Sequence, residues 1–187
     1  MTICVFGDSI AFGMNDFEQG GWVVRLKRAG YSLANLSVGG ETSSGVLDRI
    51  RRGTGKCGAV IIAGGANDSA YSGERSNAVT SIEDFEKNVE EMIRAAKVPM
   101  AFIGLFPVDE NRTMGGEFSY DNENIGRYNR AVKKICKERG VPFVDLFEKF
   151  AKNYKALLDD GLHPNSEGHG QIAKVVEGSL KKFLAKN

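Results

Sequence analysis

The sequence has few cysteines, no long apolar run and no excess of charge of either sign. Its 187 residues include only three cysteines, Cys4, Cys57 and Cys136, which are far apart in the chain. An odd number at such spacing predicts neither a disulfide framework nor a cysteine metal site. No apolar run approaches the ~20 residues that a membrane span requires. Basic and acidic side chains number 25 and 24, so charge gives no basis for binding nucleic acid or an anionic membrane.

The remaining composition is typical of a soluble globular protein. Apolar residues make up 42% of the chain and charged residues 26%. A chain of this length is near the usual size of one domain, so we expect a single domain over residues 1–187 whose core needs no disulfide. Because an apolar strand is expected from residue 2, no signal peptide is predicted, and the expected compartment is the cytoplasm.

Apolar runs and helical patterns alternate along the chain. Runs typical of buried strands occupy residues 2–6, 31–38, 59–63, 99–106 and 141–146. Helical spacing or glycine stops predict helices at 22–29, from 43 to about 52, at 82–96, 123–139 and 147–154, and from a Ser166 cap to 184. Five such β-α repeats predict one parallel sheet with helices on both faces and right-handed crossovers.

The tripeptide Gly7-Asp8-Ser9 directly follows the first expected strand. Glycine permits a sharp turn there, which leaves Ser9 at the carboxyl end of the strand. Ligands of open α/β sheets bind at that edge, where backbone N–H groups at the start of a helical turn can stabilise an anion. Ser9 is therefore a candidate nucleophile. The alternative interpretation is that Asp8 or Ser9 only caps a helix.

A second candidate group lies near the end of the chain. Asp160 and His163 are three residues apart, so a turn can place both side chains on one side. A carboxylate on one ring nitrogen fixes the histidine tautomer and leaves the other nitrogen free to take a proton from a serine. An Asp-capped turn with a surface histidine is the alternative. Polar loops at 39–43 and 64–68, expected on the same sheet edge as Ser9, favour catalysis.

Two further patterns are not assigned to this chemistry. Residues 53–58 match G-x-G-x-x-G, but they follow a helix and precede a strand, which is the reverse of a dinucleotide site. Cys57 also stands where a phosphate loop needs serine or threonine. His169, in the first turn of the last helix, lacks zinc-type spacing and is expected to be solvent-exposed or structural.

Four short segments together resemble the SGNH hydrolases, also called the GDSL esterase and lipase superfamily, over nearly the whole chain. In family order they are Gly7-Asp8-Ser9-Ile10, Asn35-Leu36-Ser37-Val38-Gly39-Gly40-Glu41-Thr42, Gly65-Ala66-Asn67-Asp68 and Asp160-Gly161-Leu162-His163-Pro164-Asn165. The first has isoleucine where leucine is commonest. Each segment is a weak signal, but four in the right order form a specific one.

The resemblance implies a fold and a set of residue roles. The fold is a three-layer α/β/α sandwich with a flavodoxin-like parallel sheet of order 2-1-3-4-5, without metal or other cofactor. Ser9 is the implied nucleophile, and Asp160 and His163 complete a triad. The implied oxyanion hole consists of Ser9, Gly40 and Asn67. Gly39 is the alternative to Gly40, because the family pattern can be registered one residue earlier.

The expected function is hydrolysis of small, short-acyl esters through an acyl-enzyme. Loops 14–20, 69–80 and 107–122 can wall the site, and their few large apolar side chains predict no continuous channel for a long acyl chain. Loop 107–122 is interpreted as a substrate wall or as a disordered segment. Acetylated carbohydrates, lysophospholipids and thioesters are alternative substrates. A non-catalytic protein of flavodoxin-like fold that binds a small ligand is the alternative from another class.

Overall fold

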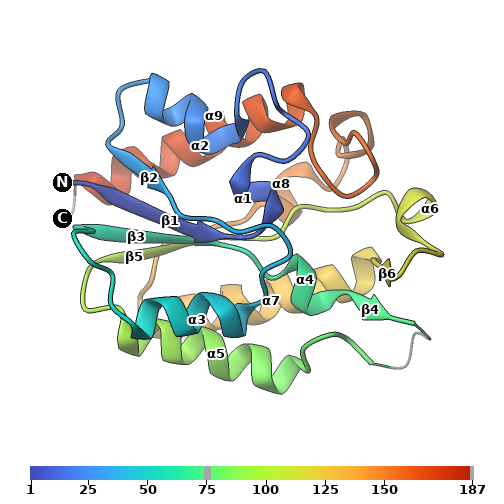
Figure 1. The fold of residues 1–187 in the computed structure, drawn as a ribbon, viewed down its shortest axis with the longest axis horizontal. Coiled ribbons are helices and arrows are strands. Elements are labelled where there is room, and N and C mark those ends of the chain that lie inside the picture. Colours follow the sequence, from blue (N-terminus) through green and yellow to red (C-terminus); the bar gives the residue numbers. More distant parts are fainter. Residues whose placement is uncertain (74–76, 186–187) are drawn as a thin grey trace.

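The central sheet has five parallel strands with helices on both sides (Figure 1). A computed structural model describes residues 1–73 and 77–185. The strands are β1 (Ile3–Gly7), β2 (Leu33–Asn35), β3 (Ala59–Ala63), β5 (Met100–Ile103) and β7 (Phe143–Val144). Their spatial order, β2-β1-β3-β5-β7, is 2-1-3-4-5 when the strands of this sheet are counted along the chain. The predicted three-layer architecture is confirmed, and so is the strand order that the family resemblance implies.

Five long helices form the two outer layers. Helices α2 (Gly21–Arg28) and α9 (Ser166–Leu184) pack together on one face of the sheet, and α3 (Ser43–Arg51), α5 (Ile82–Ala95) and α7 (Asn122–Arg139) cover the other (Figure 1). Short helices, α1 (Ser9–Phe12), α4 (Ala66–Ser69), α6 (Glu110–Thr113) and α8 (Leu146–Phe150), lie in the connections.

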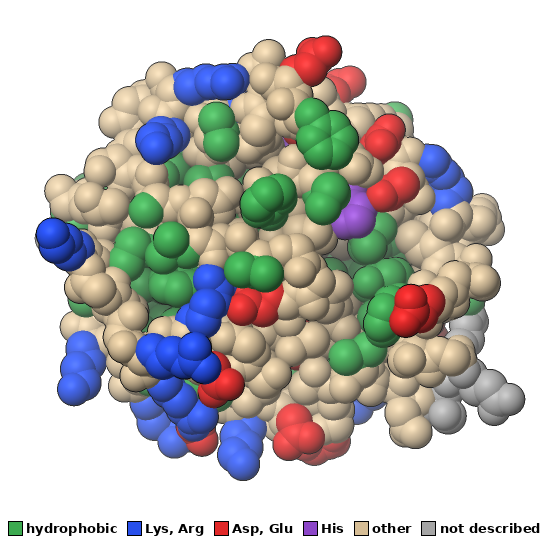
Figure 2. Space-filling model, in the orientation of Figure 1, with side chains coloured by type: hydrophobic (Ala, Val, Ile, Leu, Met, Phe, Trp, Pro, Cys, Tyr) green, Lys and Arg blue, Asp and Glu red, His purple; other side chains and the backbone are tan. Residues whose placement is uncertain are grey.

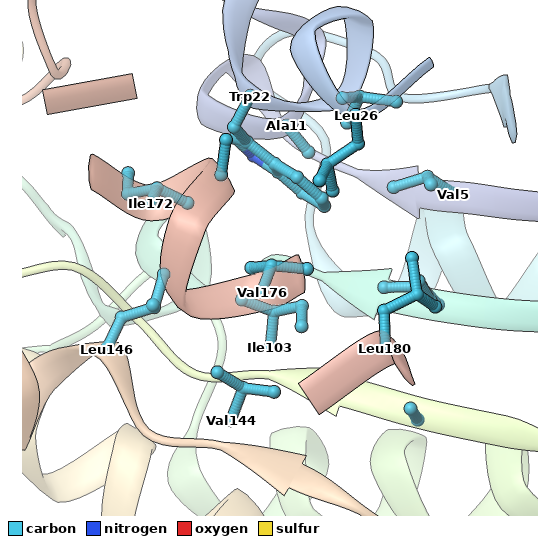
Figure 3. Packing of buried hydrophobic residues seen from close by; sticks show 14 of the residues in the cluster. Val5, Ala11, Trp22, Leu26, Ile103, Val144, Leu146, Ile172, Val176 and Leu180 are labelled. Carbon is cyan, nitrogen blue, oxygen red and sulfur yellow. The ribbon is translucent and has the colours of Figure 1, made fainter. Parts of the chain in front are cut away.

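The two faces of β1 divide the core in two. Ile3 and Val5 face the cluster under α2 and α9, whereas Cys4 and Phe6 face the cluster under the other layer, as the two-residue period of a strand requires. Figure 3 shows the first cluster, which gathers Trp22 and Leu26 of α2 with Ile172, Val176 and Leu180 of α9 over the sheet. Each such buried side chain contributes roughly 1.5–3 kcal/mol to folding.

Several predicted boundaries differ from the observed ones. The predicted strand 31–38 is paired as a strand only over β2, although the N–H groups of Leu36 and Val38 still donate to Val5 and Gly7 at 2.8 and 2.9 Å. The chain thus runs beside β1 beyond the end of the ladder. The cap of α9 is Asn165 rather than the predicted Ser166, because the Asn165 side chain accepts from the N–H of Gly168 at 2.9 Å.

A small second sheet was not predicted. Strands β4 (Tyr71–Ser72) and β6 (Phe118–Ser119) pair antiparallel, which joins the two segments interpreted as loops 69–80 and 107–122. Positions 74–76 of the first loop lie outside the described residues. Strands of two residues carry too little periodicity to be recognised in a sequence. The pairing gives loop 107–122 a defined position beside the sheet edge (Figure 1).

The expectation of no disulfide is wrong. Cys4 of β1 is bonded to Cys57, which lies just before β3, with their Cα atoms 5.6 Å apart. The parallel register pairs Ile3 with Ala59 and so brings cysteines 53 positions apart into contact. Because the two cysteines are far apart in the sequence, their pairing could not be predicted from the sequence. Because disulfides are rare in a reducing cytoplasm, the pair weighs against the expected compartment. Cys136 is free and buried.

We therefore expect one titratable thiol, that of Cys136, when the protein is denatured without reductant, and three after reduction. Closing a loop of this length stabilises the folded state by about 4 kcal/mol in the chain-entropy treatment, so reduction should also lower the Tm clearly. Thiol titration and thermal unfolding with and without dithiothreitol measure both effects. Three titratable thiols in the denatured, unreduced protein would contradict the disulfide.

Candidate active site

Ser9 lies at the carboxyl end of the central strand β1, as predicted. It is the first residue of α1, and the side chain of Asp8 caps this helix by accepting from the N–H of Ile10 at 3.0 Å. The turn requires glycine at position 7, because a Cβ there would lie 2.1 Å from the carbonyl oxygen of Ala63 on β3. The tight contact between the two strands thus fixes where the serine emerges. Ser9 is 9% exposed.

Three side chains form a continuous hydrogen-bonded chain. The hydroxyl of Ser9 lies 2.9 Å from Nε2 of His163, and Nδ1 of His163 lies 2.6 Å from Oδ2 of Asp160. In the tautomer with the proton on Nδ1, the ring donates to the carboxylate and Nε2 can accept from the serine. The structure therefore brings together the three residues that the sequence singled out, across more than 150 positions of the chain.

The carboxylate of Asp160 is held in its ionised form. Its other oxygen, Oδ1, accepts from the backbone N–H groups of Leu162 and His163 at 2.9 and 2.7 Å. Partial burial would raise the pKa of Asp160, but the hydrogen bonds from His163 and Leu162 outweigh that effect and lower the pKa to about 2. A carboxylate that stays charged near neutral pH can fix the histidine tautomer and stabilise an imidazolium.

Two adjacent glycines face the serine from the loop after β2. Gly40 has a φ of 75°, a left-handed conformation that favours glycine, and a Cβ added to Gly39 would lie 3.9 Å from the Cβ of Ser9. Both glycines line the same cleft as Ser9. Within the described part of the chain, the N–H of neither residue has a hydrogen-bond acceptor. Either N–H can therefore serve an anion, so the alternative between them stays open.

Asn67, at the start of α4, lines the same cleft. One N–H of its amide donates to the carbonyl of Glu41 at 3.0 Å, and the Tyr120 hydroxyl donates to its oxygen at 3.3 Å. Burial raises the pKa of Tyr120 to about 12, so the phenol keeps its proton. These two contacts fix the orientation of the amide and leave its second N–H for a ligand.

A buried carboxylate connects the segment that carries Gly40 to the segment that carries Asn67. Asp68, which is fully buried, accepts from the N–H of Ser43 at 2.9 Å and from its hydroxyl at 2.5 Å. Burial raises the pKa of Asp68, and the Ser43 hydrogen bonds oppose the rise. Ser43 begins α3 directly after the glycine loop, and Asp68 follows Asn67. The bonds therefore hold the glycine loop beside α4.

A cleft of about 350 Å³ opens beside Ser9 and His163. Its apolar lining comes from all three predicted wall loops and the loop before His163, and consists of Met14, Ala70, Val79, Phe118, Tyr120 and Leu162. On the face shown in Figure 2, hydrophobic side chains gather on both sides of the visible histidine, with acidic side chains beside it. The apolar side chains that were scattered in the sequence are thus collected on one surface. Loop 107–122 contributes to it, as a substrate wall would.

His169 is structural rather than solvent-exposed. It is fully buried, and its Nε2 lies 3.0 Å from the carbonyl oxygen of Met14. Burial lowers the pKa of His169 and so favours the neutral ring. In the ranges that the structure describes, no group of His, Cys, Asp and Glu side chains is arranged to hold a metal ion. Nor does any described helix combine the length and apolar character of a membrane span.

Sequence reasoning missed two residues that contact the candidate catalytic groups. Tyr120 orients Asn67, and Asn15 donates from its side-chain amide to Oδ2 of Asp160 at 3.0 Å. The sequence pattern places Tyr120 only among the large apolar side chains of loop 107–122. Asn15 belongs to no motif, and nothing in the local pattern distinguishes it from an ordinary loop asparagine.

Asp8 is buried beside the site at a cost to stability. Burial raises the pKa of Asp8 to about 6, against the opposing effects of the Ile10 N–H and of positive charge on His163. Its pKa in the unfolded chain is near 3.9. A carboxyl whose pKa is higher in the folded state binds its proton more tightly there. The free energy of unfolding therefore falls as the pH rises from about 4 to about 6.

Asp8→Asn should remove this penalty, because asparagine caps a helix as well as aspartate does and carries no charge. We expect the variant to be more stable than the wild type at pH 8 by roughly 2–3 kcal/mol, and equally stable at pH 4. Thermal and urea unfolding at the two pH values measure the difference. A variant with the same pH dependence as the wild type would show that Asp8 does not carry the penalty.

Comparisons with known proteins agree with this geometry. A model of the GDSL-like lipase/acylhydrolase family matches residues 5–171. The chain is 28% identical over 193 aligned positions to the isoamyl acetate-hydrolyzing esterase 1 homolog of Bos taurus, with 89% of this chain and 76% of that protein covered. It is also 28% identical over 141 positions to the isoamyl acetate-hydrolyzing esterase of Saccharomyces cerevisiae, with 66% and 58% covered.

Among solved structures, the fold is similar to that of a lipase/acylhydrolase from Enterococcus faecalis. The TM-score is 0.79 at 21% sequence identity, over 97% of this chain and 96% of that one. At this identity the likeness concerns the fold. The family match is more specific, since it runs from the strand before Ser9 to beyond His163. The chain therefore belongs to the GDSL-like lipase/acylhydrolase family and is an ester hydrolase.

Proposed function

We propose that the protein hydrolyses short-acyl carboxylic esters through an acyl-enzyme on Ser9. The observation that carries the proposal is the hydrogen-bonded chain from Ser9 through His163 to Asp160, with contacts of 2.9 and 2.6 Å, at the wall of the apolar cleft. A protein that only bound a small ligand would need neither a base beside the hydroxyl nor a carboxylate behind the base.

In the acylation step, the Ser9 hydroxyl attacks the ester carbonyl carbon while Nε2 of His163 takes its proton. Asp160 stabilises the imidazolium that forms. The tetrahedral intermediate then collapses: the bond between the carbonyl carbon and the alcohol oxygen breaks, and the alcohol leaves with the proton from Nε2. The products of this half-reaction are the free alcohol and an ester between the acyl group and Ser9.

In the second half-reaction, water replaces the alcohol. Nε2 of His163 takes a proton from the water as its oxygen attacks the acyl carbon, and the same proton returns to Ser9 when the acid leaves. In both halves the carbonyl oxygen becomes negative. We assign its stabilisation to the backbone N–H of Ser9, the N–H of Gly40 and the free amide N–H of Asn67. Gly39 is the alternative to Gly40, since both line the cleft.

The cleft supports a small substrate. Its volume of about 350 Å³ lies at the lower end of the range for small-molecule sites. Its apolar lining suits an acyl or alkyl group, and each methylene contributes about 0.8 kcal/mol only while the cleft can bury it. The names of two relatives specify isoamyl acetate, a short-acyl ester, and that chemistry fits a cleft of this size. Acetylated carbohydrates, lysophospholipids and thioesters use the same acyl-transfer steps and serve as comparison substrates.

A p-nitrophenyl ester series from acetyl to dodecanoyl, measured below micellar concentrations, tests the proposal. We expect kcat/KM to be highest between acetyl and butyryl and to fall beyond about eight carbons, where added methylenes gain no burial. Ser9→Ala is the blank at every chain length. An optimum at dodecanoyl would contradict the short-acyl assignment, and equal rates for the wild type and Ser9→Ala would contradict catalysis by Ser9.

A further inference from the structure

Asn15 reaches the candidate triad from a loop outside all four family-like segments. We infer that Asn15 is a positioning residue, which holds the carboxylate of Asp160 in place behind His163. The inference rests on the proposed roles of Asp160 and His163. Met14 lines the cleft but Asn15 does not, so Asn15 is placed to act through Asp160 rather than on the substrate.

Four donors surround the Asp160 carboxylate, and they divide between its two oxygens. Backbone N–H groups from its own turn occupy Oδ1. The Asn15 amide, at 3.0 Å, and Nδ1 of His163, at 2.6 Å, converge on Oδ2. Asn15 therefore supplies the only side-chain donor besides the histidine among the described partners of this carboxylate. The Asn15 amide thereby fixes Oδ2, the oxygen that accepts from Nδ1 of His163.

Because Asp160 is partly exposed to water, its orientation depends on the hydrogen bond from Asn15. Its side chain is 44% exposed, whereas that of His163 is 17% exposed. Water can compete for an exposed carboxylate and can support other orientations of it. An amide fixed on the protein reduces that competition, because it is already placed at the oxygen before the imidazolium forms.

The backbone of Asn15 adopts an uncommon conformation. Its φ of 65° is the only positive value at a non-glycine position in the described chain. Asparagine enters this left-handed region more readily than most residues. Such conformations persist where the surroundings impose them and are concentrated at functional sites. Here the conformation places the amide at Asp160.

The neighbours of Asn15 connect its loop to α9, the helix that begins just after His163: Met14 contacts it directly, and Asp16 is linked to it through Arg25 of α2. The carbonyl of Met14 accepts from the buried His169. Asp16 accepts from Arg25 at 3.0 Å, and the same Arg25 nitrogen donates to the carbonyl and hydroxyl oxygens of Ser166 at 2.9 and 2.7 Å. Burial would raise the pKa of Asp16, but the bonds from Ser166 and Arg25 lower it. The loop is thus linked to the helix that follows His163, directly at Met14 and through Arg25 at Asp16.

Two substitutions separate the amide from the backbone conformation. Asn15→Gly accepts the left-handed φ without strain and removes only the donor. We expect its kcat to fall about tenfold, with KM within about twofold of the wild type, because a hydrogen bond to a charged group is lost. Asn15→Asp keeps the shape but places a second negative charge beside Asp160. It should also shift the acidic limb of the kcat/KM profile upward by about half a pH unit, because that charge favours the imidazolium.

Rates are normalised to the active sites titrated with a fluorophosphonate, so that loss of folded protein does not count as loss of catalysis. Gln19→Ala is the matched control: it lies in the same loop, is exposed, and contacts Arg28 rather than the site. Its kcat should equal that of the wild type. A wild-type kcat per titrated site in Asn15→Gly, together with an unmoved acidic limb in Asn15→Asp, would overturn the inference.

A proton NMR measurement distinguishes failure of this inference from failure of the proposed function. The Nδ1–H proton of His163 in its bond to Asp160 should shift or broaden in Asn15→Gly and stay unchanged in Gln19→Ala, whether or not an ester is turned over. An unchanged resonance in Asn15→Gly would count against positioning by Asn15. If the wild type and Ser9→Ala hydrolysed esters equally, the proposed function would fail, and this resonance would decide the role of Asn15 alone.

Discussion

The hydrogen bond between Ser9 and His163 joins the first strand of the chain to the loop before its last helix, and much of the fold serves to make that contact possible. Ser9 is fixed because β1 packs against β3 closely enough that position 7 must be glycine. His163 is fixed because α9 packs on α2 over the same face of the sheet (Figure 3). Hydrogen bonds through Asp16 and Arg25 then connect the loop after Ser9 to the start of α9.

The carboxyl groups at this sheet edge differ in their burial and in the direction in which their pKa values are shifted. Asp8 and Asp68 are buried carboxylates, and burial raises the pKa of both. Asp160, in contrast, is partly exposed and surrounded by donors, which lower its pKa. Neighbouring carboxyl groups therefore differ in how readily they carry charge. Such differences between the pKa values of neighbouring carboxyl groups are common at sites where one carboxylate stays ionised beside a histidine base. Natural proteins retain the loss of stability that a buried carboxylate causes where activity depends on it.

The sequence was informative where one local signal decided the outcome. The apolar run 59–63 coincides with β3, and Ser9, Asp160 and His163 could be singled out because a strand end and a three-residue spacing restrict where their side chains lie. The sequence was uninformative where two residues far apart in the chain come into contact only after folding. The Cys4–Cys57 bond depends on the register of β1 and β3, the β4–β6 pair is only two residues long, and the contact of Asn15 with Asp160 spans 145 positions. His169 could not be identified as buried, because its partner is the backbone of Met14.

The central claim is that the His163–Asp160 pair activates Ser9 as a nucleophile. The most direct measurement is intact-mass analysis with peptide mapping after reaction with a fluorophosphonate, which modifies only an activated serine at an appreciable rate. One phosphonyl group should be found on Ser9 in the wild type, none in Ser9→Ala, and a much slower reaction in His163→Ala. An adduct on another residue, or equal labelling of the wild type and Ser9→Ala, would contradict the account.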